Sequence, residues 1–230
     1  MAVHGKPLTP LSADRIVKAA FAIADRDGLP ALSMRRVAKE LGCNPMSLYE
    51  HVTNKEELLD LVADSALAEL PEIDPAAEWC TAMTELMTAL HSLLVRYPAV
   101  AHIMVQRPLS GPMALERGGA AIEALLRAGF DDATSVELFI AVASYTIGVS
   151  LYEIARKDPE VLGAVGRFDS LAEHDRPILY RLGRRIAMVT DERQFDAGLG
   201  HLLLGYSGER SSLAQERGAE ANHLRTEKER

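Results

Sequence analysis

Helical periodicity runs through almost the whole of this chain, and it restricts the possible folds more than any other feature. Apolar residues recur three and four positions apart, as in Ile16, Ala19, Ala20 and Ile23, while the alternation typical of strands is rare. Leu and Ala, both strong helix formers, must supply much of the core because aromatic residues make up only 5% of the sequence. The pattern predicts an all-α fold of about ten helices.

Gly and Pro residues divide this pattern into segments. Four helices are expected between residues 12 and 70, the last of them long. Further helices are expected over 76–96, 99–106, 112–128, 132–157, 174–188 and 191–207, with a loop over 158–172. At 230 residues the chain is one large domain or two small ones. We expect a flexible arm over 1–10, a three-helix domain over 11–56, a larger helical domain over 57–207, and a disordered tail over 208–230.

The sequence lacks three features that would place the protein outside the cytoplasm or in a membrane. Cys43 and Cys80 form no CxxC pair, which favours a reducing compartment. The first residues contain no apolar segment of the kind found in secretory signals. The longest uncharged stretch, 138–152, has 15 residues and is shorter than a membrane span. A cytoplasmic protein that does not enter a membrane is therefore expected.

The segment over residues 32–55, LSMRRVAKELGCNPMSLYEHVTNK, predicts a helix-turn-helix unit. Gly42 lies in the tight turn, and the small residue Ala38 permits a close approach of the two helices. The second helix of such a unit enters the DNA major groove with its N-terminal end leading. Leu48 and Val52 would pack inward. The alternative is a purely structural turn, because two short helices around a glycine occur in many all-α proteins.

The net charge of −8 at first argues against a protein that coats nucleic acid. Its distribution changes this interpretation. Residues 1–55 hold eight Lys and Arg against five Asp and Glu, a local balance of +3, which leaves −11 for the rest of the chain. A basic end joined to an acidic body is typical of a DNA-reading module attached to a domain that does not bind DNA.

The run SMRRVAKELGCNPMSLYEHVTNKEELLDLV closely resembles the DNA-binding domain of the tetracycline-repressor (TetR) family, over Ile16 to Leu61. The resemblance implies a homodimer whose two recognition helices read the half-sites of a near-palindromic double-stranded DNA operator. It also implies which residues contact or face the DNA: Arg35, Pro45, Met46, Ser47, Tyr49, Glu50, His51 and Lys55.

These residues would have different roles in the implied DNA complex. Arg35 is the best candidate for a bidentate contact to guanine. Tyr49, His51 and Lys55 would contact phosphates, which position a protein without specifying sequence. Tyr49 could instead pack on the first helix, and Lys55 could be a solvated residue at a helix start. The tetracycline repressors themselves have an aromatic residue at the position of Glu50, which we expect to point outward, with base reading as a minority alternative.

A weaker resemblance to the C-terminal domain of the tetracycline repressors extends the match to about residues 12–207. Its carriers include Tyr97-Pro98, the run from Arg107 to Pro112, and the run from Phe195 to Gly198. It implies that the helices over 132–157 and 191–207 pair with their symmetry mates in a four-helix bundle. The expected interface residues are Ala141, Gly148, Phe195, Leu199, Leu202, Leu203 and Tyr206. The last five also form an apolar stripe at helical spacing, which could instead be an ordinary core stripe within one chain.

The same resemblance implies a ligand pocket inside the larger domain. Polar residues within apolar stretches and soft methionine walls mark the candidates: His102, Gln106, Ser144, Tyr145, Tyr152, Met83, Met87 and Met104. Each could also be a satisfied core residue. Ser144 and Tyr152 correspond to the positions at which tetracycline repressors hold the metal side of their drug complex, so a metal chelate is not expected. A hydrophobic or amphipathic small molecule is the better candidate.

No enzyme motif is found, since GxSxG, P-loop, HExxH and GxGxxG patterns are absent and the seven histidines lack metal-ligand spacing. No metal or cofactor is expected. The predicted function is a ligand-responsive DNA-binding transcriptional regulator, a homodimeric repressor released from its operator by a small molecule. The alternatives are an activator on the same scaffold, and an all-α small-molecule-binding protein or enzyme whose helix-turn-helix is only structural.

Overall fold

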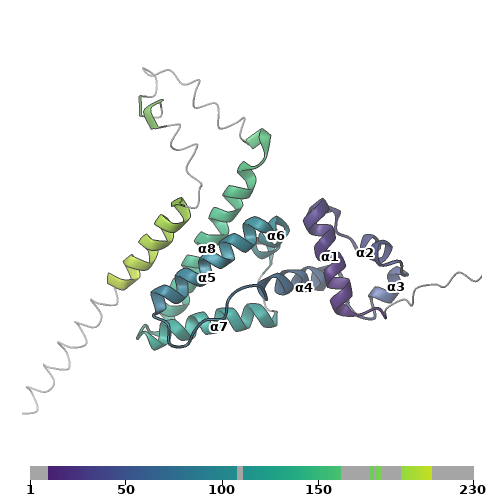
Figure 1. The fold of residues 1–230 in the computed structure, drawn as a ribbon, viewed down its shortest axis with the longest axis horizontal. Helices are drawn as coiled ribbons and strands as arrows, with labels where there is room; N and C mark the ends of the chain where they lie inside the picture. Colours follow the sequence, from purple (N-terminus) through teal and green to yellow (C-terminus); the bar gives the residue numbers. More distant parts are fainter. Residues whose placement is uncertain (1–9, 108–110, 162–176, 179, 183–192, 209–230) are drawn as a thin grey trace, which may run out of the picture. The chain divides into compact units, whose positions relative to one another are not determined.

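The structure, a computed structural model, describes residues 10–107, 111–161, 177–178, 180–182 and 193–208. Within these ranges the chain forms helices and connecting turns and contains no strand, which confirms the all-α prediction (Figure 1). The tail over 209–230, nearly all of the arm, and most of the helix expected over 174–188 and of the loop expected over 158–172 lie outside the described residues.

The chain divides into two compact units. The first joins Met1–Glu69 to Arg96–Leu115, and the second joins Leu70–Val95 to Glu116–Arg230. The first unit contains α1 (Ala13–Asp27), the 3-10 turn η1 (Leu29–Ala31), α2 (Met34–Leu41), α3 (Pro45–Leu48), α4 (Lys55–Leu67) and α6 (Pro98–Gln106). Because α4 and α6 pack with α1, this unit is larger than the 11–56 domain expected from the sequence.

Side-chain caps begin several helices of the first unit. The hydroxyls of Ser12 and Ser33 accept from the backbone N–H groups of Arg15 and Arg36. Asn54 caps α4 by accepting from the N–H of Glu57 at 2.7 Å. These contacts satisfy N–H groups that have no partner within the helix, so the boundaries follow from local chemistry.

Tertiary contacts attach α4 to α6 and to the start of α7 (Pro112–Arg127) within the first unit. The guanidinium of Arg107 donates to both carboxylate oxygens of Asp60, at 2.6 and 2.9 Å. The carboxylate of Asp64 accepts from the N–H groups of Met113 and Ala114, at 2.9 and 3.1 Å. Such charge-assisted hydrogen bonds are stronger than neutral ones, and here they hold α4 against the segment that follows α6.

The second unit contains α5 (Trp79–Arg96) up to Val95, most of α7, α8 (Asp132–Arg156) and a helix over 193–208. Trp79 packs edge-on against Phe130 with ring centroids 5.0 Å apart. The ring of His91 lies parallel to Phe195 at 4.3 Å, and Phe195 lies nearly parallel to Tyr145 at 6.0 Å. These ring contacts join α5, α8 and the helix over 193–208 in one core.

The helix α8 combines a buried face with an exposed apolar one. Thr146 and Ser150 are buried, and their hydroxyls donate to the carbonyl oxygens four residues earlier. On the other side Ile140 and Tyr152 are 55% and 67% exposed. In length and composition alone this helix could cross a membrane, although the 15-residue uncharged stretch had suggested otherwise. The same features occur in core and interface helices of soluble proteins, so they are weak evidence for a membrane span.

Candidate DNA-binding site

A tight turn joins α2 to α3 and fixes the geometry of the helix-turn-helix unit. Gly42 ends α2 in the left-handed conformation, with φ 67° and ψ 30°. The N–H of Cys43 donates to the carbonyl of Ala38 at 3.0 Å, which closes the helix end. Asn44 then caps α3 by accepting from the N–H of Met46 at 2.9 Å, and Pro45 occupies the first helical position.

The helix α3 is a single turn whose inner and outer faces are clearly divided. Leu48 and Val52, predicted to pack inward, are 0% and 1% exposed. Met46 and Tyr49 are 70% and 46% exposed, and Glu50 and His51 are exposed as well. Pro45 and Ser47 are half-buried at the leading end. Met46 and Tyr49 are therefore accessible to a molecule that binds on this face.

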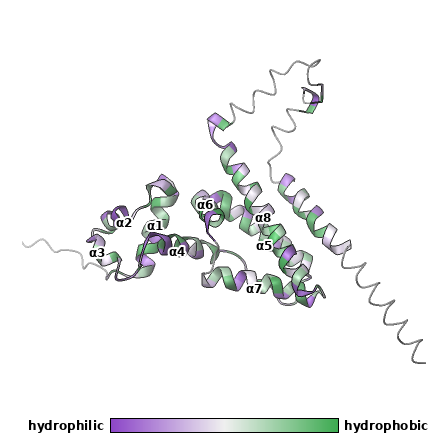
Figure 2. Cartoon of the chain, turned by 180° about the vertical axis from the view of Figure 1, so that it is seen from behind, coloured by the Kyte–Doolittle hydropathy of each residue, from purple (hydrophilic) through white to green (hydrophobic). Residues whose placement is uncertain are grey.

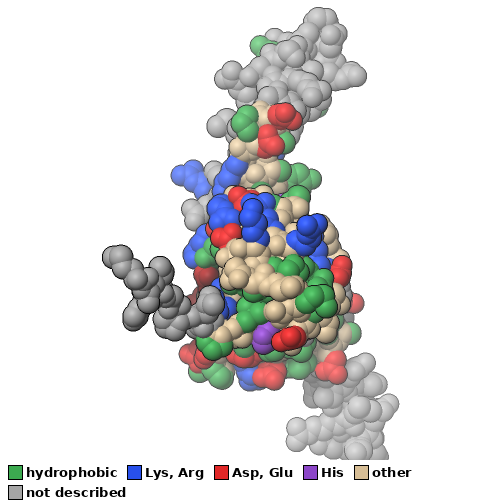
Figure 3. Space-filling view, turned by 90° about the vertical axis from the view of Figure 1, so that its right-hand side faces the viewer, with side chains coloured by type: hydrophobic (Ala, Val, Ile, Leu, Met, Phe, Trp, Pro, Cys, Tyr) green, Lys and Arg blue, Asp and Glu red, His purple; other side chains and the backbone are tan. Residues whose placement is uncertain are grey.

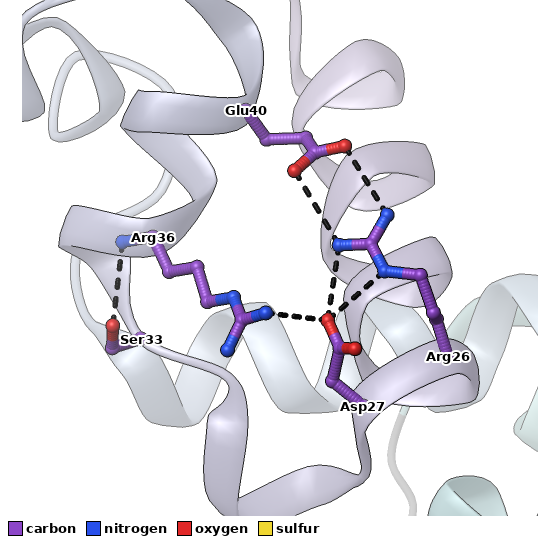
Figure 4. Close-up of polar contacts among 5 residues, drawn as sticks. All are labelled: Arg26, Asp27, Ser33, Arg36 and Glu40. Atoms are coloured by element: carbon purple, nitrogen blue, oxygen red, sulfur yellow. Dashed lines mark hydrogen bonds and ion pairs between the residues drawn. The ribbon is translucent and has the colours of Figure 1, made fainter.

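Some Lys and Arg side chains of the first unit are engaged in ion pairs, and others remain available to contact DNA. Arg26 bonds to both Asp27 and Glu40, and Arg36 donates to Asp27 at 2.6 Å, as Figure 4 shows. Arg35 and Lys39 are exposed and have no ion pair in the part of the chain that the structure describes. The sequence count of +3 treated all these residues alike, but only unpaired cations are free to meet phosphates.

The available cations lie beside an open hollow on this face. Ser33, Arg35, Lys39, Cys43 and Pro45 are among the residues that line it, so it connects α2 to the leading end of α3. Figure 3 views the molecule from the side of α2 and α3, where Lys and Arg side chains gather with acidic side chains among them. In Figure 2 the same two helices carry mainly hydrophilic colours. This arrangement suits a polyanion that is held by a few specific contacts.

Lys55 lies at the start of α4, where its neighbours fix the backbone. Glu57 turns back and accepts from both the N–H and the hydroxyl of Thr53, while Asn54 caps the helix. These hydrogen bonds hold the pKa of the Glu57 carboxyl below its usual value. Glu57 thus reaches back toward the helix start as in a capping box, except that it accepts from Thr53 and not from the N–H of the cap residue Asn54.

Two features of this site were missed in the sequence. Lys39 was not singled out, although it lies one helical turn after Arg35 and so shares its face. The pairing of Asp27 with Arg36 joins two different helices and has no short-range signal.

The residues expected to line one ligand pocket are distributed over both units. His102, Met104 and Gln106 belong to the first unit, and the other five belong to the second. Met83 and Met87 are buried, as soft core walls would be. Ser144 and Tyr152 are exposed on α8, and Tyr145 donates its hydroxyl to the carbonyl of Gln194 at 2.9 Å. The described residues therefore do not enclose Ser144 or Tyr152.

His91 was not anticipated as a polar core residue. It is 6% exposed, and its Nε2 lies 3.2 Å from the carboxylate of Glu153 on α8. A signal for its burial was present, because His91 follows Met87 by four residues and precedes Leu94 by three, which places it on the apolar face of α5.

The expected dimer residues separate into two groups. Phe195, Leu199 and Leu203 are at most 2% exposed and are buried inside their own chain, so the alternative of a core stripe applies to these three. Their side chains can support an interface but cannot form its surface. Ala141, Gly148, Leu202 and Tyr206 are partly exposed. More exposed apolar residues on the same helices are Val136, Ile140, Tyr152 and Leu204.

Comparison with known proteins supports the interpretation of both units. Residues 16–62 match the family described as "Bacterial regulatory proteins, tetR family", and residues 70–208 match "Tetracyclin repressor-like, C-terminal domain". An HTH-type transcriptional regulator of Saccharopolyspora erythraea is 38% identical over 87% of this chain and 85% of its own length. The HTH-type transcriptional repressor DrrR1 of Streptomyces coeruleorubidus is 34% identical over 67% of this chain and 58% of its own length.

Solved structures agree with these matches. ActR of Streptomyces coelicolor, in complex with actinorhodin, superimposes with a TM-score of 0.75 at 32% identity, covering 86% of this chain and 95% of that one. The relatives are regulators of transcription and not enzymes. The two family models together span more than half of the sequence, so this chain belongs to the TetR family of bacterial transcriptional regulators.

Proposed function

We propose that this protein is a cytoplasmic, homodimeric repressor that binds a near-palindromic operator and leaves it when a small hydrophobic or amphipathic molecule binds. One observation carries the DNA-binding part of the proposal. The Gly42 turn presents α3 with Met46 and Tyr49 outward, next to the unpaired cations Arg35 and Lys39. Arg35 can reach a base edge, while Tyr49, His51, Lys39 and Lys55 supply donors to phosphates.

The outer face of α8 supports dimerisation through this helix. Val136, Ile140 and Tyr152 are 42%, 55% and 67% exposed, and only 22% of the most apolar window of this helix is buried within the chain. Gly148 lies on this helix with open space where a Cβ would be. A second copy of α8 would cover these side chains, and two-fold symmetry would place two recognition helices on one operator.

Release by a small molecule is supported by a relative. ActR, at 32% identity, has been solved in complex with actinorhodin. A ligand changes operator affinity only if it binds the two conformations of the protein unequally. The relative DrrR1 is named a transcriptional repressor, which favours repression by this protein. A reporter assay distinguishes a repressor from the alternative, an activator on the same scaffold.

A gel shift tests the proposal. The full chain is titrated against the intergenic DNA next to its own gene at low and at physiological salt, and a retarded band that weakens steeply with salt is expected. Unchanged mobility across this whole stretch at low salt would contradict the proposal. Sedimentation of Ile140→Glu should give monomers and weaker operator binding, whereas Leu115→Glu, an exposed residue of α7, should remain dimeric. Dimeric Ile140→Glu protein would disprove the α8 interface.

A further inference from the structure

A pocket in the first unit has no role in the function proposed so far. It has a volume of about 530 Å³ and lies where the end of α1, the η1 turn, the start of α4 and α6 meet. This volume falls within the range of small-molecule sites, which is about 300–1,000 Å³. Leu29, Leu59 and Pro98 provide apolar walls, while Asp25, Lys55, His102 and Gln106 provide polar groups.

A backbone hydrogen bond fixes which ring nitrogen of His102 can accept a hydrogen bond from a ligand. Its Nδ1 lies 2.7 Å from the carbonyl oxygen of Pro98. A carbonyl can only accept, so Nδ1 must carry the hydrogen, and in the neutral ring Nε2 is left as an acceptor. His102 and Gln106 lie one helical turn apart on α6 and both line the pocket. Both were expected to line a ligand site in the larger domain, and here they line a pocket within the first unit.

Two side chains of opposite charge in the pocket also restrict which ligand it can bind. Lys55 and Asp25 both line it, and they form no ion pair with each other or with other described residues. Lys55 offers donors to an anion or carbonyl, and Asp25 offers acceptors to a hydroxyl. The apolar walls favour a ligand with an apolar skeleton, because burial of apolar area provides most of the affinity of such sites.

We infer that this pocket is a second effector site, which takes a compact aromatic molecule carrying a hydroxyl donor at one end and a carboxylate or carbonyl acceptor at the other. His102 Nε2 accepts from the hydroxyl, and Lys55 binds the acceptor group. The effect on DNA rests on the proposed function. Because Lys55 also belongs to the DNA-facing surface, a ligand that holds it lowers operator affinity, and the operator lowers ligand affinity by the same factor.

The test uses the full chain without DNA, and a hydroxynaphthoate with its hydroxyl and carboxylate at opposite ends of the fused rings. Amide NMR shifts are followed during titration. We expect a Kd of about 1 mM, which is ordinary for a ligand of this size. The shifts should be concentrated in residues 28–31, 55–59 and 99–106. The corresponding naphthoate, which lacks the hydroxyl, should bind about tenfold more weakly.

Two variants identify the contacts. His102→Phe should lower affinity for the hydroxynaphthoate to that of the naphthoate. Lys55→Met should weaken both probes, whereas Lys39→Met, which removes another cation of the same DNA-facing surface, should bind both normally. Shifts confined to α5, α7 and α8, or an absence of binding by the folded protein, would overturn the inference.

Operator binding is measured separately by gel shift without probe. If the probe binds as described but no operator is bound, the proposed function fails while the pocket assignment holds. If the protein binds the operator but not the probe, the pocket assignment fails while the proposed function holds.

Discussion

The polar groups of the two units are stabilised in opposite ways. In the first unit exposed ion pairs within α1 and between α1 and α2 join Arg26, Asp27, Arg36 and Glu40. In the second unit the rings of His91 and Tyr145 lie against Phe195, and the Tyr145 hydroxyl donates to the carbonyl of Gln194. Exposed pairs contribute little to stability because water and salt screen them, whereas a buried ring contributes through its packing. Stability should therefore depend strongly on the second unit, and DNA affinity on the unpaired cations of the first.

The largest effect is expected from Phe195→Ala. Phe195 is fully buried between His91 and Tyr145, and removal of its ring should lower the free energy of unfolding by about 3–5 kcal/mol. Denaturant unfolding followed by the fluorescence of Trp79 measures this loss, since Trp79 is the only tryptophan and belongs to the same unit. A loss below about 1 kcal/mol would show that the stack is not a main support of the unit.

A smaller loss is expected from Gly198→Ala. A Cβ at Gly198 would overlap the hydroxyl end of the Tyr145 ring, which donates to the carbonyl of Gln194. Moving this ring should lower the free energy of unfolding by about 1–3 kcal/mol. Gly200→Ala is the matched control, because open space surrounds that position and alanine favours a helix by about 0.8–1 kcal/mol. Equal effects of the two substitutions would contradict the described position of Tyr145.

The third prediction concerns DNA and compares two arginines of the first unit. Arg35→Gln should weaken operator binding by about tenfold to a hundredfold, the range for loss of a bidentate base contact. Arg26→Gln should change it by less than about threefold, because this guanidinium is already engaged by Asp27 and Glu40. Gel shifts at one salt concentration measure both, with circular dichroism as the check on folding. A stronger loss in the Arg26 variant would reverse the division into occupied and available cations.

The smallest effect is a dependence of stability on pH. Hydrogen bonds from Arg26, together with the charges of Arg26 and Arg36, hold the pKa of Asp27 below its usual value. A lowered pKa stabilises the folded protein above the unfolded pKa of about 4, and this contribution is lost as the pH falls through the folded pKa. Asp27→Asn should therefore be less stable than the natural protein near neutral pH, and the difference should shrink in acid. A difference that is constant with pH would exclude a role for this charge.

The helix-turn-helix was predictable because its signals are local. Ser33, Gly42 and Asn44 each act on backbone groups within a few residues, and the structure shows each of them in the cap or turn that its residue type favours. The spacing of Leu48 and Val52 likewise predicted which side of α3 is buried. Helix boundaries in the larger domain were predicted within about three residues at α5, α6, α7 and α8, because Pro and Gly mark their ends.

The features that the sequence did not reveal depended on partners distant in the sequence. Phe195, Leu199 and Leu203 fall on one helical stripe, and spacing cannot distinguish a stripe that faces its own chain from one that faces a partner. His102 and Gln106 are polar residues on an apolar helix, but their neighbours across the pocket come from α1, η1 and α4. The pairing of Asp27 with Arg36 joins α1 to α2 across the η1 turn.

The sequence by itself determined the all-α class, the helix-turn-helix and the family, because these depend on periodicity, caps and a distinctive run of residues. Only the tertiary structure decided which cations remain free, which face of α8 is exposed, and which residues form the pocket around His102. The physical reason is that burial and ion pairing depend on which helices meet, and residues far apart in the chain decide that together.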